Sequence, residues 1–238
     1  MRYVYFTIFL FSFYFTKCQN QKLELTYIFN VVDFSKSLDI NNQYKSYFSE
    51  KIKNYNLLSN YLSIEVISNK TDYIVKFDDI LGTDNFTNSE ITALKSLILP
   101  FSPIYIKENQ IYAQNNLVEN VLISFTEDKI LKWKITSERK KILNYDCYKA
   151  IPIEVNDSFK NNLSLVPEEI WFSPELNFKA SPSLFSNVPG VILEMKYKNF
   201  NLKVHKVTFS NKNLEYINME SFKLISYAEF ENLIQRNN

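Results

Sequence analysis

Glycine is almost missing from this chain of 238 residues, which contains only two. Because glycine makes up about 7% of an average protein, turns that require a positive φ must here use other residues, chiefly asparagine. Histidine is rarer still, with His205 as its single occurrence. A zinc site with two histidine ligands from one chain is therefore excluded, and any histidine base would have to be His205.

Cysteine is also scarce, since the chain holds only Cys18 and Cys147. If Cys18 is lost with an N-terminal signal, no disulfide can form within the mature chain. The free thiol of Cys147 lies among aromatic residues in a predicted strand. There it is either a small buried hydrophobic group or, in an exported protein, a reactive or intermolecular thiol.

The N-terminal segment has the pattern of an export signal. A single early positive charge, Arg2, precedes an apolar run that is too short to span a bilayer as a stable anchor. We predict a signal peptide over residues 1–18 and one β-rich domain over residues 19–238. The mature protein would then be periplasmic or secreted, without a transmembrane anchor. A lipid anchor on Cys18 is a competing prediction, disfavoured because Lys17 stands where a small residue is expected.

The chain also lacks an excess of either positive or negative charge. The chain has 27 basic and 26 acidic residues, a net charge of +1. Removing Arg2 and Lys17 with the signal leaves 25 minus 26, or −1. A near-neutral chain without a basic stripe does not favour nucleic acid, because that binding depends on neutralising phosphates.

Aromatic and branched apolar residues are abundant, with 20 Phe and 16 Tyr. This composition favours pleated, half-buried sheets. Apolar residues alternate along several stretches, as Leu23, Leu25, Tyr27 and Phe29 do, and alternation indicates strands. We predict strands over residues 23–34, 61–68, 73–77, 104–113, 117–125, 130–136, 145–155, 166–172, 191–198 and 202–209.

Two capping-box patterns indicate helix starts. Thr87 stands three residues before Glu90, and Ser226 three residues before Glu229. The second pattern predicts a final helix over about residues 227–236. The polar stretch before the second predicted strand is either a loop or a short helix that covers a sheet edge. The predicted fold is therefore mainly β (α+β), a curved antiparallel sheet with one or two short helices, one of them at the C-terminus.

The only Pro-Gly pair of the chain precedes an apolar run. Proline fixes φ and glycine accepts a positive φ, so residues 187–191 are predicted to form a type II turn that leads into a strand. Alternation then places neighbouring side chains on opposite faces of that strand. We predict a structural role for the residues of this motif, namely Pro189, Gly190, Ile192, Leu193 and Glu194.

Carboxylates do not form a recognisable catalytic set. Glu168 and Glu169 are adjacent in a predicted strand and must point to opposite faces, while Asp78 with Asp79 and Glu127 with Asp128 fall in loops or turns. No spacing matches a calcium loop. We therefore predict no catalytic residue, no cofactor and no metal ligand, although an acid pair assembled from distant strands would leave no trace in the sequence.

Large aromatic side chains are the remaining candidates for a binding site. They either line an apolar pocket for a lipid or peptide or form the core, where aromatics contribute much of the buried area. The candidates for such a pocket are Trp133, Trp171, Phe172 and Phe185.

Three segments in the C-terminal half resemble the GLPGLI family of exported bacterial proteins. Residues 187–192 read Asn-Val-Pro-Gly-Val-Ile against the Gly-Leu-Pro-Gly-Leu-Ile of that family. Residues 133–150 match its Trp, Lys-x-Ile and Tyr-x-Cys-x-Lys-Ala pattern, and residues 169–176 its Trp-containing segment. The resemblance implies export in a Gram-negative bacterium and brings no activity. The strand order of that family is similar to that of lipoprotein-carrier folds, in which a curved half-barrel wraps an apolar cavity.

These observations predict an exported, non-enzymatic β-rich protein that binds an apolar ligand or a partner segment on the concave face of its sheet. The partner would be a lipid, a peptide or an envelope protein. One alternative is a structural protein that joins envelope partners through sheet edges or exposed aromatics. Another is a hydrolase that uses two carboxylates converging in a cleft.

Overall fold

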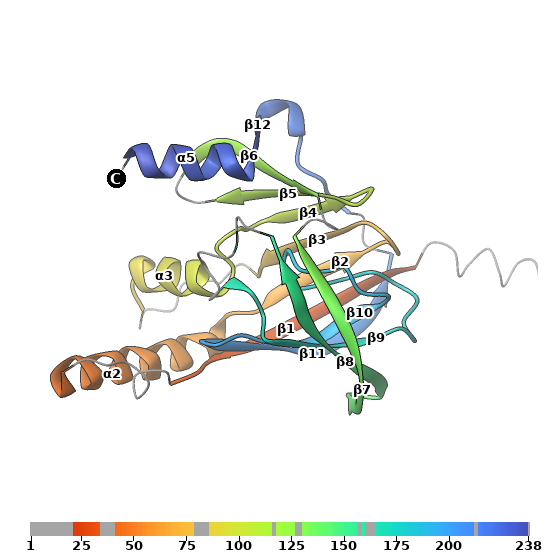
Figure 1. Cartoon of the computed structure of the whole chain (residues 1–238), viewed down its shortest axis with the longest axis horizontal. Coiled ribbons are helices and arrows are strands. Elements are labelled where there is room, and N and C mark those ends of the chain that lie inside the picture. Colours follow the sequence, from red (N-terminus) through yellow and green to blue (C-terminus); the bar gives the residue numbers. More distant parts are fainter. Residues whose placement is uncertain are drawn as a thin grey trace, which may run out of the picture.

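A single sheet of 12 strands forms the body of the protein (Figure 1). The computed structural model describes residues 21–33, 41–78, 86–115, 118–126, 130–156, 159, 165–211 and 214–237. The strands are β1 (Lys22–Val31), β2 (Ile64–Ser68), β3 (Tyr73–Phe77), β4 (Ile104–Lys107), β5 (Gln110–Asn115), β6 (Val118–Thr126), β7 (Leu131–Ile142), β8 (Tyr145–Val155), β9 (Glu169–Ser173), β10 (Val191–Lys196), β11 (Phe200–Ser210) and β12 (Lys223–Ser226).

Three α-helices accompany the sheet within the described ranges. They are α2 (Asn42–Leu58), α3 (Asn88–Ile98) and α5 (Tyr227–Asn237), and short 3₁₀ turns occur at η2 (Ser59–Tyr61) and η5 (Met219–Ser221). The predicted mainly β fold with a curved sheet and a C-terminal helix is confirmed. The helices outnumber the one or two expected, because α2 occupies the stretch for which loop and helix remained open.

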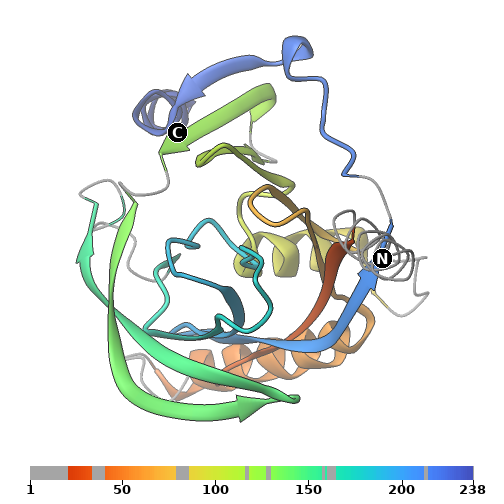
Figure 2. The same cartoon turned by 90° about the vertical axis from the view of Figure 1, so that its right-hand side faces the viewer.

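The strand order explains why the sheet curves. The order is β12-β6-β5-β4-β3-β2-β1-β11-β10-β9-β8-β7. The consecutive strands β6 and β7 therefore lie near opposite ends of it. From Thr126 to Leu131 the chain can reach at most roughly 18 Å, so the two ends of the sheet must come close together. Figure 2 shows the result, a sheet that curls into a bowl.

Two antiparallel meanders make up the sheet. One runs from β1 to β6 and the other from β7 to β11, and the pairing of β1 with β11 joins them. Among the described strand pairs, only β12 with β6 is parallel, so the sheet is mixed where a purely antiparallel one was expected.

The predicted strand over residues 104–113 is divided by a tight turn. Glu108 and Asn109 have φ values of 52° and 64°, and β4 and β5 pair on either side of them. Two successive residues with positive φ close a two-residue hairpin. The turn was missed because the sequence places no glycine there. Asparagine takes a positive φ again at Asn120 and Asn177, as expected for a chain poor in glycine.

Capping residues fix where the helices begin. The Thr87 side chain accepts from the Glu90 backbone N–H at 3.2 Å, and the Glu90 carboxylate accepts from the Thr87 N–H at 3.0 Å. Ser226 and Glu229 make the same reciprocal pair at the start of α5. Both predicted capping boxes are thus confirmed.

Helix α2 is hydrogen-bonded to the sheet through the side chain of Asn56. The Asn56 amide accepts from the Val31 N–H at 2.8 Å and donates to the Val31 carbonyl at 2.9 Å. Ile52 and Leu58 bury the inner face of the helix. Two bonds to the end of β1 and two buried side chains thus hold α2 along the rim of the bowl, next to α3 (Figure 1).

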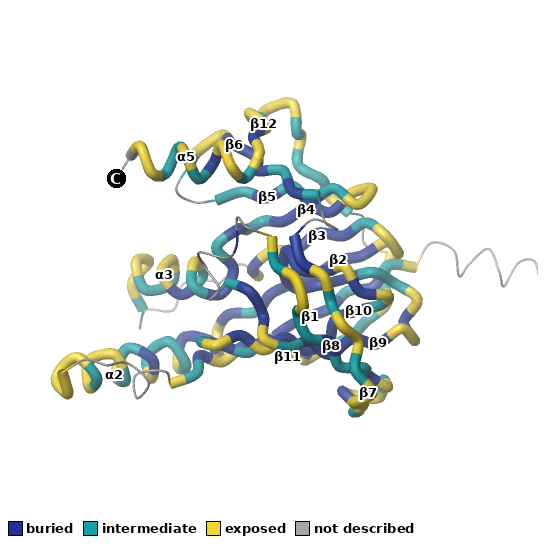
Figure 3. Tube along the Cα trace, viewed as in Figure 1, coloured by how far each residue is buried: buried dark blue, intermediate teal, exposed yellow. Residues whose placement is uncertain are grey.

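The core follows the concave side of the sheet. Leu23, Leu25 and Tyr27 of β1 are fully buried, and the inner strands are buried along most of their length in Figure 3. Helix α5 packs on β6 through a cluster of aromatic rings, Phe101, Phe125, Phe159, Tyr227 and Phe230. None of the helices that the structure describes is long and apolar enough to cross a membrane.

Candidate functional site

The concave side of the bowl is occupied by the chain itself. Residues 174–190, which we call the inner segment, connect β9 to β10 and lie inside the curled sheet (Figure 2). Ser181, Leu184, Phe185 and other side chains of this segment are buried. In the part of the chain that the structure describes, the concave face is therefore filled by the protein's own side chains.

Serine hydroxyls satisfy the buried backbone of the inner segment. Ser181 donates to the Phe185 carbonyl at 3.0 Å and accepts from the Ser183 N–H at 3.2 Å, while Ser183 accepts from the Phe185 N–H at 3.2 Å. Such local bonds help a segment without helix or strand to stay buried, because they give partners to backbone groups that no ladder pairs. The inner segment is therefore part of the protein core.

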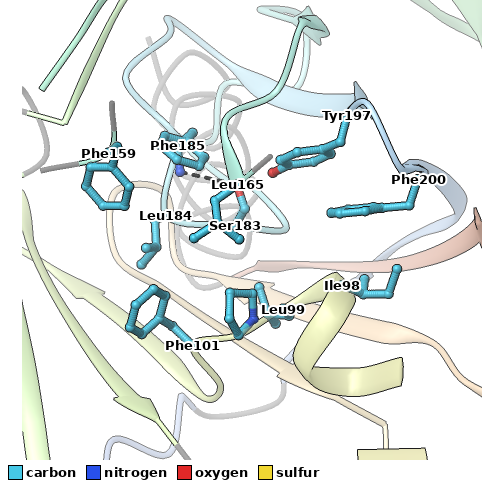
Figure 4. A pocket seen from close by; sticks show the side chains of 11 residues that line it. Ile98, Leu99, Phe101, Phe159, Leu165, Ser183, Leu184, Phe185, Tyr197 and Phe200 are labelled. Atoms are coloured by element: carbon cyan, nitrogen blue, oxygen red, sulfur yellow. Dashed lines mark hydrogen bonds between the residues drawn. The ribbon is translucent and has the colours of Figure 1, made fainter. Parts of the chain in front are cut away.

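A small cavity remains beneath the inner segment (Figure 4). Its volume is about 30 Å³, enough for roughly one or two water molecules. Ser183 and Tyr197 bring hydroxyls to it, and both hydroxyls contact the Met195 sulfur. The remaining lining is apolar: Ile98, Leu99, Pro100, Phe101, Phe159, Leu165, Leu184, Phe185 and Phe200.

The four aromatic residues expected to line a pocket do not come together. Phe185 lines the cavity, whereas Trp133, Trp171 and Phe172 are not among its lining residues. Phe172 is buried against the Tyr148 ring, with centroids 6.1 Å apart. Trp133 lies opposite Pro152 in the β7–β8 pair.

Trp171 belongs to a charged network on the convex face. Met195 touches the inner segment, so Glu194, its neighbour in β10, points to the opposite face. There Lys140 pairs with Glu194 at 2.7 Å and lies 4.2 Å from the centre of the Trp171 ring. The ammonium of Lys140 thereby contacts both the buried carboxylate of Glu194 and the indole of Trp171. These two contacts join β7 to β10 and β9.

Glu169 is the centre of the same network. It pairs with Lys196 at 2.6 Å and with Lys149 at 2.9 Å, and accepts from the Trp171 indole at 3.3 Å. Burial acts to raise the pKa of Glu169, but the hydrogen bonds from Lys196, Lys149 and Trp171 outweigh it and lower the pKa to about 2. Glu169 therefore stays ionised near neutral pH and cannot act as a general acid there.

The Pro-Gly motif forms a tighter turn than the predicted type II turn. The Gly190 N–H donates to the Val188 carbonyl at 2.9 Å, and the Val188 N–H to the Ser186 carbonyl at 2.7 Å. Both bonds close three-residue turns. Gly190 has φ of +153°, far from the value of about +80° in a type II turn. The position nevertheless requires glycine, because an added Cβ would lie 2.3 Å from the Ser173 carbonyl oxygen.

Ile192, Leu193 and Glu194 of the motif lie in β10. Ile192 and Leu193 are fully buried, and the Ile192 carbonyl accepts a hydrogen bond from the Tyr27 hydroxyl. Pro189 precedes the glycine at the end of the inner segment. The structural role of the motif stays a prediction, which substitution of Gly190 tests.

Cys147 is a free, buried cysteine in β8. Burial, the largest effect, raises the pKa of its thiol to about 11. A thiol that remains protonated at neutral pH is a poor nucleophile. His205, the only histidine, is exposed on β11.

The larger of the two cavities described here is an open groove between α2 and α3. We call it the α2–α3 groove; it has a volume of about 410 Å³, within the range of small-molecule sites. It is lined by Asn54, Leu57, Asn60, Tyr61, Phe86 and Glu90. The rings of Tyr61 and Phe86 lie 6.0 Å apart with a tilt of 58° and form one wall.

Glu90 gives the α2–α3 groove a fixed negative group. The Thr87 backbone N–H and then the Thr87 hydroxyl donate to its carboxylate and lower the pKa of Glu90. The carboxylate is therefore ionised and held in one orientation by the capping box. The sequence revealed Glu90 only as a helix cap, because the opposite wall depends on a helix, α2, that the sequence left undecided.

Within the described ranges, no group of three or more His, Cys, Asp or Glu side chains could hold a metal ion. The α2–α3 groove, with aromatic, amide and carboxylate groups facing one open space, is the best candidate for a functional site.

Comparison with known proteins gives two matches. The family model described as N-glycanase peptide, N-terminal domain, matches residues 51–229. Two solved structures of PNGF-II, in space groups C2 and P21, match with TM-scores of 0.51 and 0.53 and identities of 17% and 18%. Each match covers 91% of this chain, and this chain spans about a third of each solved chain, 33%. No curated protein matches.

These matches correct three predictions. The GLPGLI assignment is wrong, because the matching family model is that of the N-glycanase domain. The residues on which the resemblance rested lie in β7, β8, β9 and the turn into β10. The predictions of a non-enzymatic protein and of an apolar ligand on the concave face are also wrong, since the matching family belongs to a glycan-processing enzyme.

Proposed function

The chain belongs to the family of the N-glycanase peptide, N-terminal domain, and from this membership we propose that it takes part in the enzymatic removal of N-linked glycans from proteins. The single observation that carries the proposal is the family match over residues 51–229. This range contains every residue that lines the α2–α3 groove. The likeness to PNGF-II supports a shared fold.

Within this proposal the domain acts on glycoprotein as substrate. Its groove offers an open site with fixed polar groups, while Glu169 is held ionised in its network of ion pairs. A glycan-releasing enzyme must hold its substrate as well as perform the chemical step, and the groove is suited to holding the substrate.

The test uses the chain and one N-glycosylated protein. Release of glycan is followed by mass spectrometry of the protein, and retention is measured on the same glycoprotein immobilised before and after chemical removal of its glycans. We expect glycan release, or retention that depends on the glycans. A chain that neither releases glycan nor distinguishes the two forms contradicts the proposal.

Export remains part of the same proposal. Residues 1–18, which lie outside the described residues, have the signal pattern derived above, and glycoprotein substrates outside the cell would require export. N-terminal sequencing of the protein recovered from periplasm and medium should begin at Gln19. A chain that retains Met1, or carries lipid on Cys18, would contradict cleavage after Cys18.

A further inference from the structure

We propose that the α2–α3 groove is a subsite for a neutral sugar ring of the glycan. This inference rests on the proposed function, and it names the ligand class and the residues that recognise it.

Apolar contact surface is the first requirement of such a subsite. One face of a pyranose ring is covered by C–H groups, and aromatic or aliphatic side chains pack against it. Tyr61 is 53% exposed and Leu57 58% exposed, although both are large hydrophobic residues. Their exposed surfaces border the same groove as the Phe86 ring. The wall is therefore apolar, open to solvent and not covered by any described part of the chain.

Polar groups at fixed positions are the second requirement. Asn54 and Asn60 bring side-chain amides, which both donate and accept, and Glu90 brings an ionised acceptor. Sugar hydroxyls also donate and accept, so they can pair with all three. A purely apolar ligand would leave the remaining hydrogen-bonding capacity of these groups unused, and an anionic ligand would be repelled by Glu90. A neutral polyhydroxylated ring fits both parts of the lining.

The walls are held in place by the local fold. Asn54 and Leu57 lie on α2, Asn60 and Tyr61 follow in η2, and Glu90 is anchored by the capping box of α3. The Asn60 amide donates to the Asn56 carbonyl at 3.3 Å, on the residue that ties α2 to β1. The site is thus arranged before the ligand binds, which lowers the entropy lost on binding.

The experiment measures binding of N,N′-diacetylchitobiose and of a mannose trisaccharide by saturation-transfer NMR and calorimetry. We expect weak binding of at least one sugar to the full chain. Tyr61→Ala and Phe86→Ala should each weaken that binding about five- to tenfold, the effect of losing one aromatic contact.

Tyr44→Ala is the matched control, because Tyr44 is 62% exposed on the same helix but lies outside the groove. It is ten residues before Asn54, roughly 15 Å along α2, and its substitution should leave binding unchanged. The thermal midpoints of Tyr61→Ala and Tyr44→Ala should agree with that of the unsubstituted chain, since both tyrosines are exposed. Phe86 packs partly against the core, so the binding of Phe86→Ala is measured at a temperature at which that variant is folded.

Two results would overturn the inference. One is the absence of binding to either sugar while an unglycosylated peptide binds the groove; the other is equal sugar affinity in the Tyr61→Ala variant and the unsubstituted chain. In both cases glycan-dependent retention on the glycoprotein could persist, so the proposed function would stand while the subsite would not. Absence of both glycan release and glycan-dependent retention would instead count against the proposed function.

Discussion

The ammonium of Lys140 lies 2.7 Å from a carboxylate oxygen of Glu194, 54 residues further along the chain. The Glu194 side chain is only 10% accessible, so little water is available to solvate its carboxylate. Lys140→Met should therefore lower the free energy of unfolding by roughly 2 kcal/mol, because an unpaired carboxylate would remain buried. Urea denaturation measures the change.

Lys132 provides the control for this prediction. It pairs with Glu154 at the same distance, 2.7 Å, on the same strand, but both side chains are more than half exposed. Lys132→Met should cost at most about 0.5 kcal/mol. The double substitution Lys140→Met with Glu194→Leu should recover most of the loss. Equal effects of the two lysine substitutions would show that burial of Glu194 is not what matters.

Gly190→Ala should reduce stability by roughly 2 to 4 kcal/mol. The φ of +153° is rarely adopted by residues with a side chain, and the new Cβ would lie 2.3 Å from the Ser173 carbonyl oxygen. Pro189→Ala, one residue earlier, should cost only about 1 kcal/mol, mainly through the unfolded chain. Thermal unfolding compares the two variants. If Gly190→Ala is as stable as Pro189→Ala, the structural role of the glycine is refuted.

Glu169 should make stability depend on pH in the acid range. Its pKa is about 2 in the folded protein and near 4.5 ordinarily, so its contribution is complete above 4.5 and is lost as pH falls toward 2. Glu169→Gln should be less stable than the unsubstituted chain at pH 6, by roughly 1 to 2 kcal/mol. That difference should shrink steadily below pH 4.5 in urea titrations. A difference that does not change with pH would contradict the assignment.

Cys147 should resist alkylation while the protein is folded. With the thiol pKa at about 11 and the side chain fully buried, little thiolate forms at pH 8, and reagents cannot reach it. Iodoacetamide labelling followed by mass spectrometry should be far slower in the folded chain than in urea. Equal labelling rates in the two conditions would mean that the thiol is accessible.

Much of the local structure could be predicted from the sequence. Alternation identified most strands, and the pairs Thr87 with Glu90 and Ser226 with Glu229 located two helix starts, because these signals act within a few residues. The hairpin at Glu108 and Asn109 was missed because asparagine replaces glycine in this chain, and its positive φ leaves no distinct sequence pattern.

The candidate site depends on contacts that a sequence does not display. Tyr61 and Phe86 form one wall only because β2 and β3 bring α2 and α3 side by side, and Glu90 looked like an ordinary helix cap. The same limit explains the error over the concave face. Serines 181 and 183 appear as loop residues in the sequence, yet their hydroxyls are what allow the inner segment to be buried.

The pairing of β1 with β11 carries a consequence for how the protein folds. Within each meander, strands pair with neighbours in sequence, so both halves can form by short-range steps. The junction instead joins residues such as Leu23 and Phe209, which are 186 positions apart, and closing so long a loop is slow. We expect the halves to assemble first and to meet last, so that Leu25→Ala in β1 mainly accelerates unfolding in chevron measurements.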